Sequence, residues 1–188
     1  MSVRAATGFS SEPDSIEAFR AAHPYEEPAF DVVELADLST DTGLGRIGTL
    51  PAPMPLDRFT DHVARSLPAT AAGVRSTGDP TAMVSSVAVC GGSGDGLFDV
   101  VRAAGVDAYV TADLRHHPAS EAAAHGRPAL IDVPHWASEW PWLPVAAEAL
   151  VGELSREGTT VETHVSVVTT DPWTRHVPSR THDEGSIR

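Results

Sequence analysis

Short apolar, β-branched stretches alternate with helix-like stretches through the second half of this 188-residue chain. The predicted strands cover residues 84–90, 108–111 and 129–133, and glycine or proline residues separate them from the elements that follow. Helices are predicted at residues 97–104, at 118–125 and after Pro141. Three consecutive strand-to-helix units need crossover connections, so this pattern predicts a mostly parallel sheet with helices covering its faces.

The rest of the chain adds further predicted elements around this unit. Helical spacing is present over residues 15–22 and 56–66. Strand-like patterns occur at residues 29–35, 46–50, more weakly at 72–76, and last at 160–168. No internal repeat of fixed period is visible.

Charge and composition exclude several classes of partner. The chain carries 26 Asp and Glu against 13 basic residues, all of them Arg, for a net charge of −13. Such a surface repels nucleic acid and anionic membranes, and no apolar run approaches the roughly 20 residues of a membrane span. The amino terminus has no signal-peptide pattern, and Cys90 has no second cysteine to pair with. We therefore expect a cytoplasmic protein without a nucleic-acid or membrane partner.

Three polar loops follow the predicted parallel strands. They are Gly91–Gly96, the Asp113-to-His117 segment and the His135-to-Glu139 segment. Ligands of open parallel sheets bind at the carboxyl ends of the strands, where these loops gather. We therefore expect residues that are 20 to 45 positions apart to meet at one edge of the sheet.

Metal-ligating side chains occur in two of these loops. His135 and Glu139 are four residues apart, so one helical turn places imidazole and carboxylate within reach of one divalent ion. A weak surface pair is the alternative interpretation. Asp113, His116 and His117 could supply further ligands, and a neutral histidine could act as a general acid or base. A solvated loop is the alternative there.

Other conspicuous residues favour structural interpretations. The Gly91–Gly96 loop lacks the ending of a phosphate-binding loop, so a tight turn is favoured over an anion site. Trp136, Trp140 and Trp142 are more typical of core or subunit-interface anchors than of residues that stack on a substrate. Cys90 ends an apolar strand, which favours an inert core thiol.

Taken in order, seven segments resemble the NGG-one-interacting-factor-three-like family, also called GTP cyclohydrolase type 2 homologues or dinuclear-metal-centre hexameric proteins. The resemblance covers residues 15–177. The segments are residues 23–28 (HPYEEP), 43–48 (GLGRIG), 87–94 (VAVCGGSG), 109–113 (YVTAD), 130–132 (LID), 135–139 (HWASE) and 170–173 (TDPW).

The resemblance implies a layered α/β sandwich built from two related halves, of which this chain resembles the second. It makes residues 14–42 the remnant of an inserted PII-like domain and residues 43–177 the C-terminal half of the metal-binding domain. The small, polar composition of residues 1–13 and the near absence of apolar residues at 178–188 predict a disordered start and a disordered tail. The family's remaining ligands, a histidine pair and an aspartate, belong to an N-terminal half that this sequence lacks.

Site residues and function are likewise implied by the resemblance. His135 and Glu139 match the family's C-terminal pair of metal ligands, and His117 matches a histidine near the metal cavity, a candidate catalytic proton shuttle. We expect a dinuclear centre of zinc, iron, manganese or nickel in a homohexameric, hydrolase-like protein acting on a small molecule or nucleotide. This chain alone is expected to be inactive. The alternative is a non-catalytic metal-binding regulatory or scaffold module.

Overall fold

The computed structural model describes residues 17, 21, 22, 24 and 43–178. By its internal contacts the chain divides into two compact units, Met1–Leu44 and Gly45–Arg188, and the second contains nearly all of the described residues. The predicted helix at 15–22, the strand at 29–35, the PII-like remnant at 14–42 and the disordered ends therefore lie largely or wholly outside the described residues.

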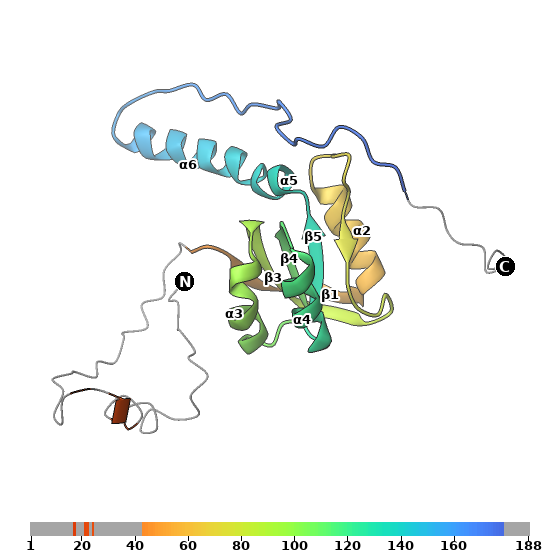
Figure 1. The fold of residues 1–188 in the computed structure, drawn as a ribbon. Coiled ribbons are helices and arrows are strands. Elements are labelled where there is room, and N and C mark those ends of the chain that lie inside the picture. Colours follow the sequence, from red (N-terminus) through yellow and green to blue (C-terminus); the bar gives the residue numbers. More distant parts are fainter. Residues whose placement is uncertain (1–16, 18–20, 23, 25–42, 179–188) are drawn as a thin grey trace. The chain divides into compact units, whose positions relative to one another are not determined.

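The second unit contains a five-stranded sheet in the order β1-β3-β4-β5-β2 (Figure 1). Its centre is parallel, formed by β3 (Met83–Ser93), β4 (Ala108–Ala112) and β5 (Ala129–Val133). The edge strands β1 (Arg46–Pro55) and β2 (Arg75–Ser76) run antiparallel to their neighbours. The predicted mixed α/β class with a mostly parallel sheet is thus confirmed for the centre, and antiparallel pairing is confined to the edges.

Helices connect the parallel strands as the periodicity predicts. A 3-10 turn, η1 (Asp95–Leu97), and α3 (Phe98–Ala103) link β3 to β4, and α4 (His116–Ala124) links β4 to β5. The second unit also contains α2 (Leu56–Ser66), the one-turn α5 (His135–Glu139) and α6 (Trp142–Arg156). No helix in the described part of the chain is both long and apolar enough to cross a membrane.

Both faces of the sheet are covered, because successive strand residues point to opposite sides. On β5, Ile131 packs into a cluster with Leu56 and Phe59 of α2, whereas its neighbour Leu130 packs into a second cluster with Val101 of α3. Two-sided burial explains why these strands read as nearly continuous apolar runs.

The predicted strand at residues 160–168 is wrong. The carboxyl-terminal segment (residues 159–178) contains no helix or strand and no fully buried residue (Figure 1, blue trace). The indole Nε1 of Trp140 donates a hydrogen bond to the Ser166 carbonyl over 2.9 Å. A β-branched sequence favours extended backbone, but a strand also needs a neighbouring strand, and the described sheet does not include one for this segment.

Candidate functional site

Two of the polar loops meet at the carboxyl ends of β4 and β5. Asp113 directly follows β4 and has a φ of 55°, a left-handed conformation that aspartate tolerates better than most residues. β5 ends at Val133, and α5 begins two residues later at His135. Because the two strands are parallel, both side chains arise at the same edge of the sheet.

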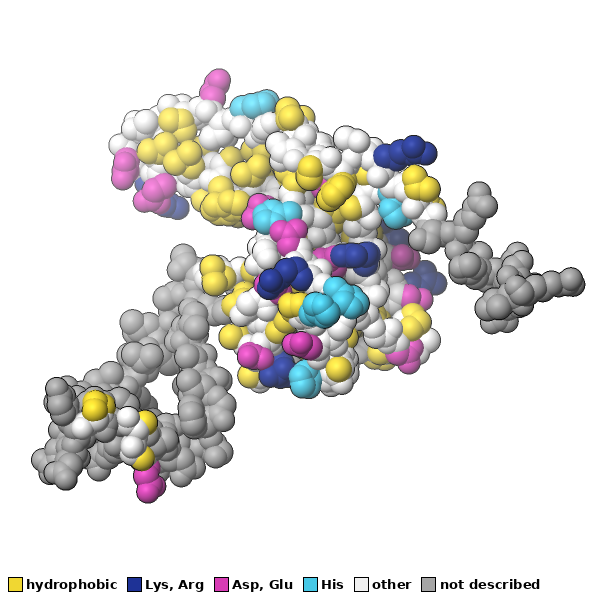
Figure 2. All heavy atoms as spheres, in the orientation of Figure 1, with side chains coloured by type: hydrophobic (Ala, Val, Ile, Leu, Met, Phe, Trp, Pro, Cys, Tyr) yellow, Lys and Arg dark blue, Asp and Glu magenta, His cyan; other side chains and the backbone are white. Residues whose placement is uncertain are grey.

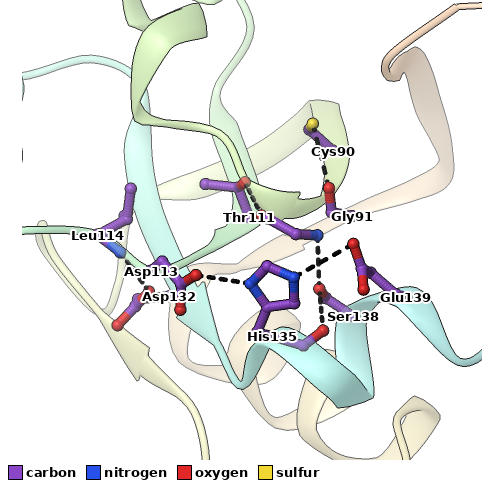
Figure 3. Close-up of polar contacts among 10 residues, drawn as sticks. Cys90, Gly91, Thr111, Asp113, Leu114, Asp132, His135, Ser138 and Glu139 are labelled. Carbon is purple, nitrogen blue, oxygen red and sulfur yellow. Dashed lines mark hydrogen bonds and ion pairs between the residues drawn. The ribbon is translucent and has the colours of Figure 1, made fainter.

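The His135 ring lies between two carboxylates (Figure 3). Its Nδ1 is 2.6 Å from Asp113 Oδ2, and its Nε2 is 3.3 Å from Glu139 Oε1. A carboxylate can only accept, so Nδ1 carries the proton and donates to Asp113. This bond orients the ring and leaves Nε2 facing Glu139, the arrangement typical of a metal-binding histidine supported by a carboxylate.

The environment of His135 favours its charged form. The hydrogen bond to Asp113 raises the pKa of the imidazole; partial desolvation opposes this, and the negative charges of Glu139 and Asp113 add to the increase. About half of each side chain remains accessible, with exposures of 46% for His135, 53% for Asp113 and 55% for Glu139. Any cation that binds Nε2 therefore competes with a proton at an accessible position.

Gly92 leaves the space that His135 and Glu139 use. Its φ is +69°, and a Cβ there would lie 2.6 Å from Glu139 Oε1 and 3.4 Å from His135 Nε2. Its amide donates a 2.8 Å hydrogen bond to Ser138 Oγ, which donates in turn to the His135 carbonyl over 2.7 Å. The glycine-rich stretch thus extends β3 and connects it to α5 through hydrogen bonds. This structural role differs from both sequence-based interpretations of the loop, the favoured tight turn and the alternative anion site.

Buried side chains hold the glycine stretch from the sheet side. The hydroxyl of Thr111, which is fully buried, donates to the Gly92 carbonyl over 3.0 Å. Tyr109 donates to the Gly94 carbonyl over 3.0 Å, and burial raises the pKa of its phenol to about 12. Both groups keep their donor protons at physiological pH, so the wall of the site is held by neutral hydrogen bonds.

Asp132 is a site residue that the sequence analysis did not single out. Its Oδ1 accepts a 3.1 Å hydrogen bond from the Leu114 amide, next to Asp113, and its Oδ2 forms an ion pair with Arg75 of β2. Two signals in the sequence could have indicated it: its position near the carboxyl end of β5, and its place in the family-like segment 130–132 (LID).

The other predicted residues lie elsewhere. His116 and His117 occupy the first turn of α4, exposed, with their rings edge to face at 5.2 Å. Among the described residues, no hydrogen bond or ion pair links His117 to His135 or Glu139. Cys90 is buried, in agreement with the core interpretation. Trp136 is half-buried, whereas Trp142 is 64% exposed.

The described residues fit part of a metal site. No group of three or more His, Cys, Asp or Glu side chains within them is arranged to hold a metal ion. His135 Nε2 and Glu139 Oε1 nevertheless offer two suitable donors side by side, beside a glycine without a side chain. Catalytic metal sites commonly use three protein ligands, so further ligands would have to come from outside the described residues.

Comparison with known sequences identifies relatives along most of the chain. A family model described as Duf34/NIF3 (NGG1p interacting factor 3) matches residues 10–172. A Mycobacterium tuberculosis protein named GTP cyclohydrolase 1 type 2 homolog is 56% identical over 156 residues, which are 83% of this chain and 40% of that protein. A Streptomyces coelicolor protein of the same name is 56% identical over 137 residues, 73% of this chain and 48% of that protein.

Solved structures of related proteins also match most of this chain. A Bacillus cereus protein related to NIF3 matches with a TM-score of 0.65 and 35% identity, over 86% of this chain and 43% of that one. Staphylococcus aureus protein SA1388 matches with a TM-score of 0.66 and 28% identity, over 87% and 46%. The chain spans less than half the length of these relatives. On the family model and these identities, the chain belongs to the Duf34/NIF3 family.

Proposed function

We propose that this chain supplies His135 and Glu139 as two ligands of a divalent-metal site in a hydrolase-like protein of the NIF3 family. The observation that carries the proposal is the His135 ring, fixed at Nδ1 by Asp113 with Nε2 facing Glu139 at 3.3 Å. Zinc, iron, manganese and nickel all suit an imidazole and carboxylate set, and affinity order alone does not choose among them.

Each residue has a distinct role in this proposal. A bound divalent ion would act as a Lewis acid and acidify coordinated water. Asp113 holds the ring of His135 in one orientation and one tautomer, and Gly92 keeps the space beside Glu139 free. His117, on the exposed first turn of α4, is the candidate for carrying protons to and from solvent.

The rest of the family architecture belongs to the same proposal. A second metal ion, further ligands and a ring-like homohexamer would involve the part of the relatives that this chain does not span. Residues 14–42 would be the tail of an inserted PII-like domain, and residues 43–177 the second half of the metal-binding sandwich. Because this chain supplies only two ligands, we expect it to be inactive alone. The name shared by the relatives supports a nucleotide-like substrate.

A non-catalytic regulatory or scaffold module is the second candidate. Figure 2 shows hydrophobic side chains gathered along α6, where Trp142, Val145 and Leu150 are all more than half exposed. Such a surface is typical of an interaction site. Retained metal, a change of oligomeric state with a small molecule and no turnover in the longer relatives would favour this candidate.

The test is Zn²⁺ affinity in the metal-stripped chain, measured by competition with a chromophoric chelator. We expect His135→Ala and Glu139→Ala each to abolish specific binding, and Asp113→Asn to weaken it about 10- to 100-fold. His125→Ala and Glu148→Ala, both at exposed positions, are matched controls and should bind like the unmodified chain. Equal affinity in the site variants and the controls would contradict the proposal.

A further inference from the structure

A cavity of about 400 Å³ adjoins the Asp113 side of the site. It is bounded by β2, the carboxyl ends of β4 and β5, the start of α5 and residues 171–176 of the carboxyl-terminal segment. Asp113 and His135 both line it, so whatever it binds lies next to the proposed metal ligands. Its volume is within the range of small-molecule sites.

Two indole rings give this cavity aromatic walls. Trp136 lines it from α5, where it is half-buried, and Trp173 lines it from the carboxyl-terminal segment with 67% of its surface exposed. A tryptophan as exposed as Trp173 contributes little to packing of the chain itself. Flat aromatic surfaces at the rim of a cavity are suited to stacking on a planar ring.

The polar part of the cavity is an ion pair with spare hydrogen-bonding capacity. Arg75 pairs with Asp132 through Nε and Nη2, and Asp132 is also fixed by the Leu114 amide. The Asp132 side chain is 15% exposed, whereas that of Arg75 is 75% exposed. Guanidinium donors and a carboxylate acceptor therefore stand side by side, which is the complement of a ring edge with an adjacent C=O and N–H.

Carboxylates outnumber guanidinium groups around the cavity, with Asp113, Asp132 and Asp171 against Arg75. Asp113 is paired with His135 and Asp132 with Arg75, whereas Asp171 accepts the Trp173 amide over 2.8 Å. An anionic ligand would meet these carboxylates at close range. The lining therefore disfavours an anionic ligand and is compatible with a neutral one.

We propose that this cavity binds a neutral heteroaromatic ring with a lactam edge, stacked against Trp136 and Trp173 and hydrogen-bonded to the Arg75–Asp132 pair. The ring would be the recognised part of the substrate or effector, so the inference deepens the proposed function and rests on it for any reaction. Binding of the ring itself requires no metal and is measured without it.

The test is isothermal titration of the metal-stripped full chain with hypoxanthine, a bicyclic ring with a lactam edge. We expect saturable binding, and about tenfold weaker binding of purine, which lacks the lactam. Trp173→Ala should weaken hypoxanthine binding about tenfold through lost stacking, and Arg75→Met should weaken it comparably. Trp142→Ala removes an equally exposed indole outside the cavity and should leave binding unchanged.

Several results would overturn the proposal: no saturable binding of hypoxanthine, equal affinity for purine, undiminished binding in Trp173→Ala, or competition by inorganic phosphate. A Zn²⁺ titration of the same preparation keeps the two proposals separate. Metal binding without hypoxanthine binding would contradict only the proposed ring site. Hypoxanthine binding without metal binding would contradict only the proposed metal site.

Discussion

The central region (residues 83–139) and the carboxyl-terminal region (residues 142–178) differ sharply in what surrounds them. The strands of the central region pair on both sides and bury Tyr109, Leu130 and Ile131 almost completely. No residue of the carboxyl-terminal region is buried, although valines and alanines are frequent in it. Apolar residues therefore form a core only where neighbouring elements cover both faces of a strand.

The largest expected difference between the two regions is the loss of stability when an apolar side chain is truncated. Ile131→Ala deletes a fully buried side chain of β5, and we expect it to lower the free energy of unfolding by about 3 kcal/mol. Val167→Ala removes a side chain that is 77% exposed and should change stability by less than about 0.5 kcal/mol. Urea denaturation of both variants measures the difference, and similar losses would show that residue 167 is covered in solution.

Each region has a glycine in the left-handed conformation, and substituting each with alanine compares the space around them. Gly92 has a φ of +69° and Gly158, after α6, a φ of +79°, so alanine costs about 1 kcal/mol of backbone strain at either position. At Gly92 the new Cβ would also meet Glu139 Oε1 at 2.6 Å, whereas nothing lies within 4 Å at Gly158. We therefore expect a total loss of about 2 kcal/mol for Gly92→Ala, and weakened Zn²⁺ affinity for this variant alone.

Denaturation and Zn²⁺ competition on the same two proteins provide the check. Gly158→Ala controls for the strain, because it shares the backbone conformation without the neighbouring carboxylate. If Gly92→Ala were no less stable and bound Zn²⁺ as tightly as Gly158→Ala, the close approach of Glu139 to Gly92 would be wrong.

Charged groups provide a smaller contrast between the regions. Asp107 accepts hydrogen bonds from the Ser85 and Ser86 amides and pairs with Arg127, with 14% of its side chain exposed. Burial alone would raise its pKa, but these hydrogen bonds and the Arg127 charge together lower it. We expect Asp107→Asn to cost about 1–2 kcal/mol at neutral pH, against less than about 0.5 kcal/mol for Glu153→Gln in the exposed pair with Arg156.

The pH dependence of the Asp107 contribution has a defined sign. Because the folded pKa is lowered, the contribution is complete above the unfolded value of about 3.9 and is lost as pH falls through the folded value. Unfolding free energies measured from pH 6 downward should therefore fall more steeply for the unmodified chain than for Asp107→Asn. Parallel curves would mean that Asp107 is not selectively stabilised in its charged form.

Periodicity predicted the central region well, and for a physical reason. The strands at 129–133 and 108–112 were found within a residue of their predicted bounds, because apolar spacing reports a two-sided environment that exists here. Outside this region, the helix at 56–66 also matches its predicted bounds, because it packs against the same sheet. The same reasoning was wrong for residues 160–168. Their β-branched residues favour extended backbone, but pairing depends on a neighbour that local sequence does not encode.

The candidate site was predictable only in part. Spacing placed His135 and Glu139 on one helical turn, and topology placed Asp113 at the same edge. The roles of Gly92 and Asp132 depend on contacts with residues 40 or more positions away in the sequence. Gly92 contacts Ser138 and leaves space for Glu139, and Asp132 pairs with Arg75. Such contacts follow from register and side-chain direction, which no local pattern specifies.

The central claim is that Asp113 holds Nδ1 of His135 so that Nε2 faces Glu139 and binds a divalent ion. Imidazole ¹⁵N chemical shifts of the labelled chain, recorded before and after addition of Zn²⁺, test this claim most directly. We predict a large shift at His135 Nε2, a retained proton at Nδ1 and unchanged shifts at His125. An unchanged Nε2, or coordination through Nδ1 with loss of the Asp113 hydrogen bond, would contradict it.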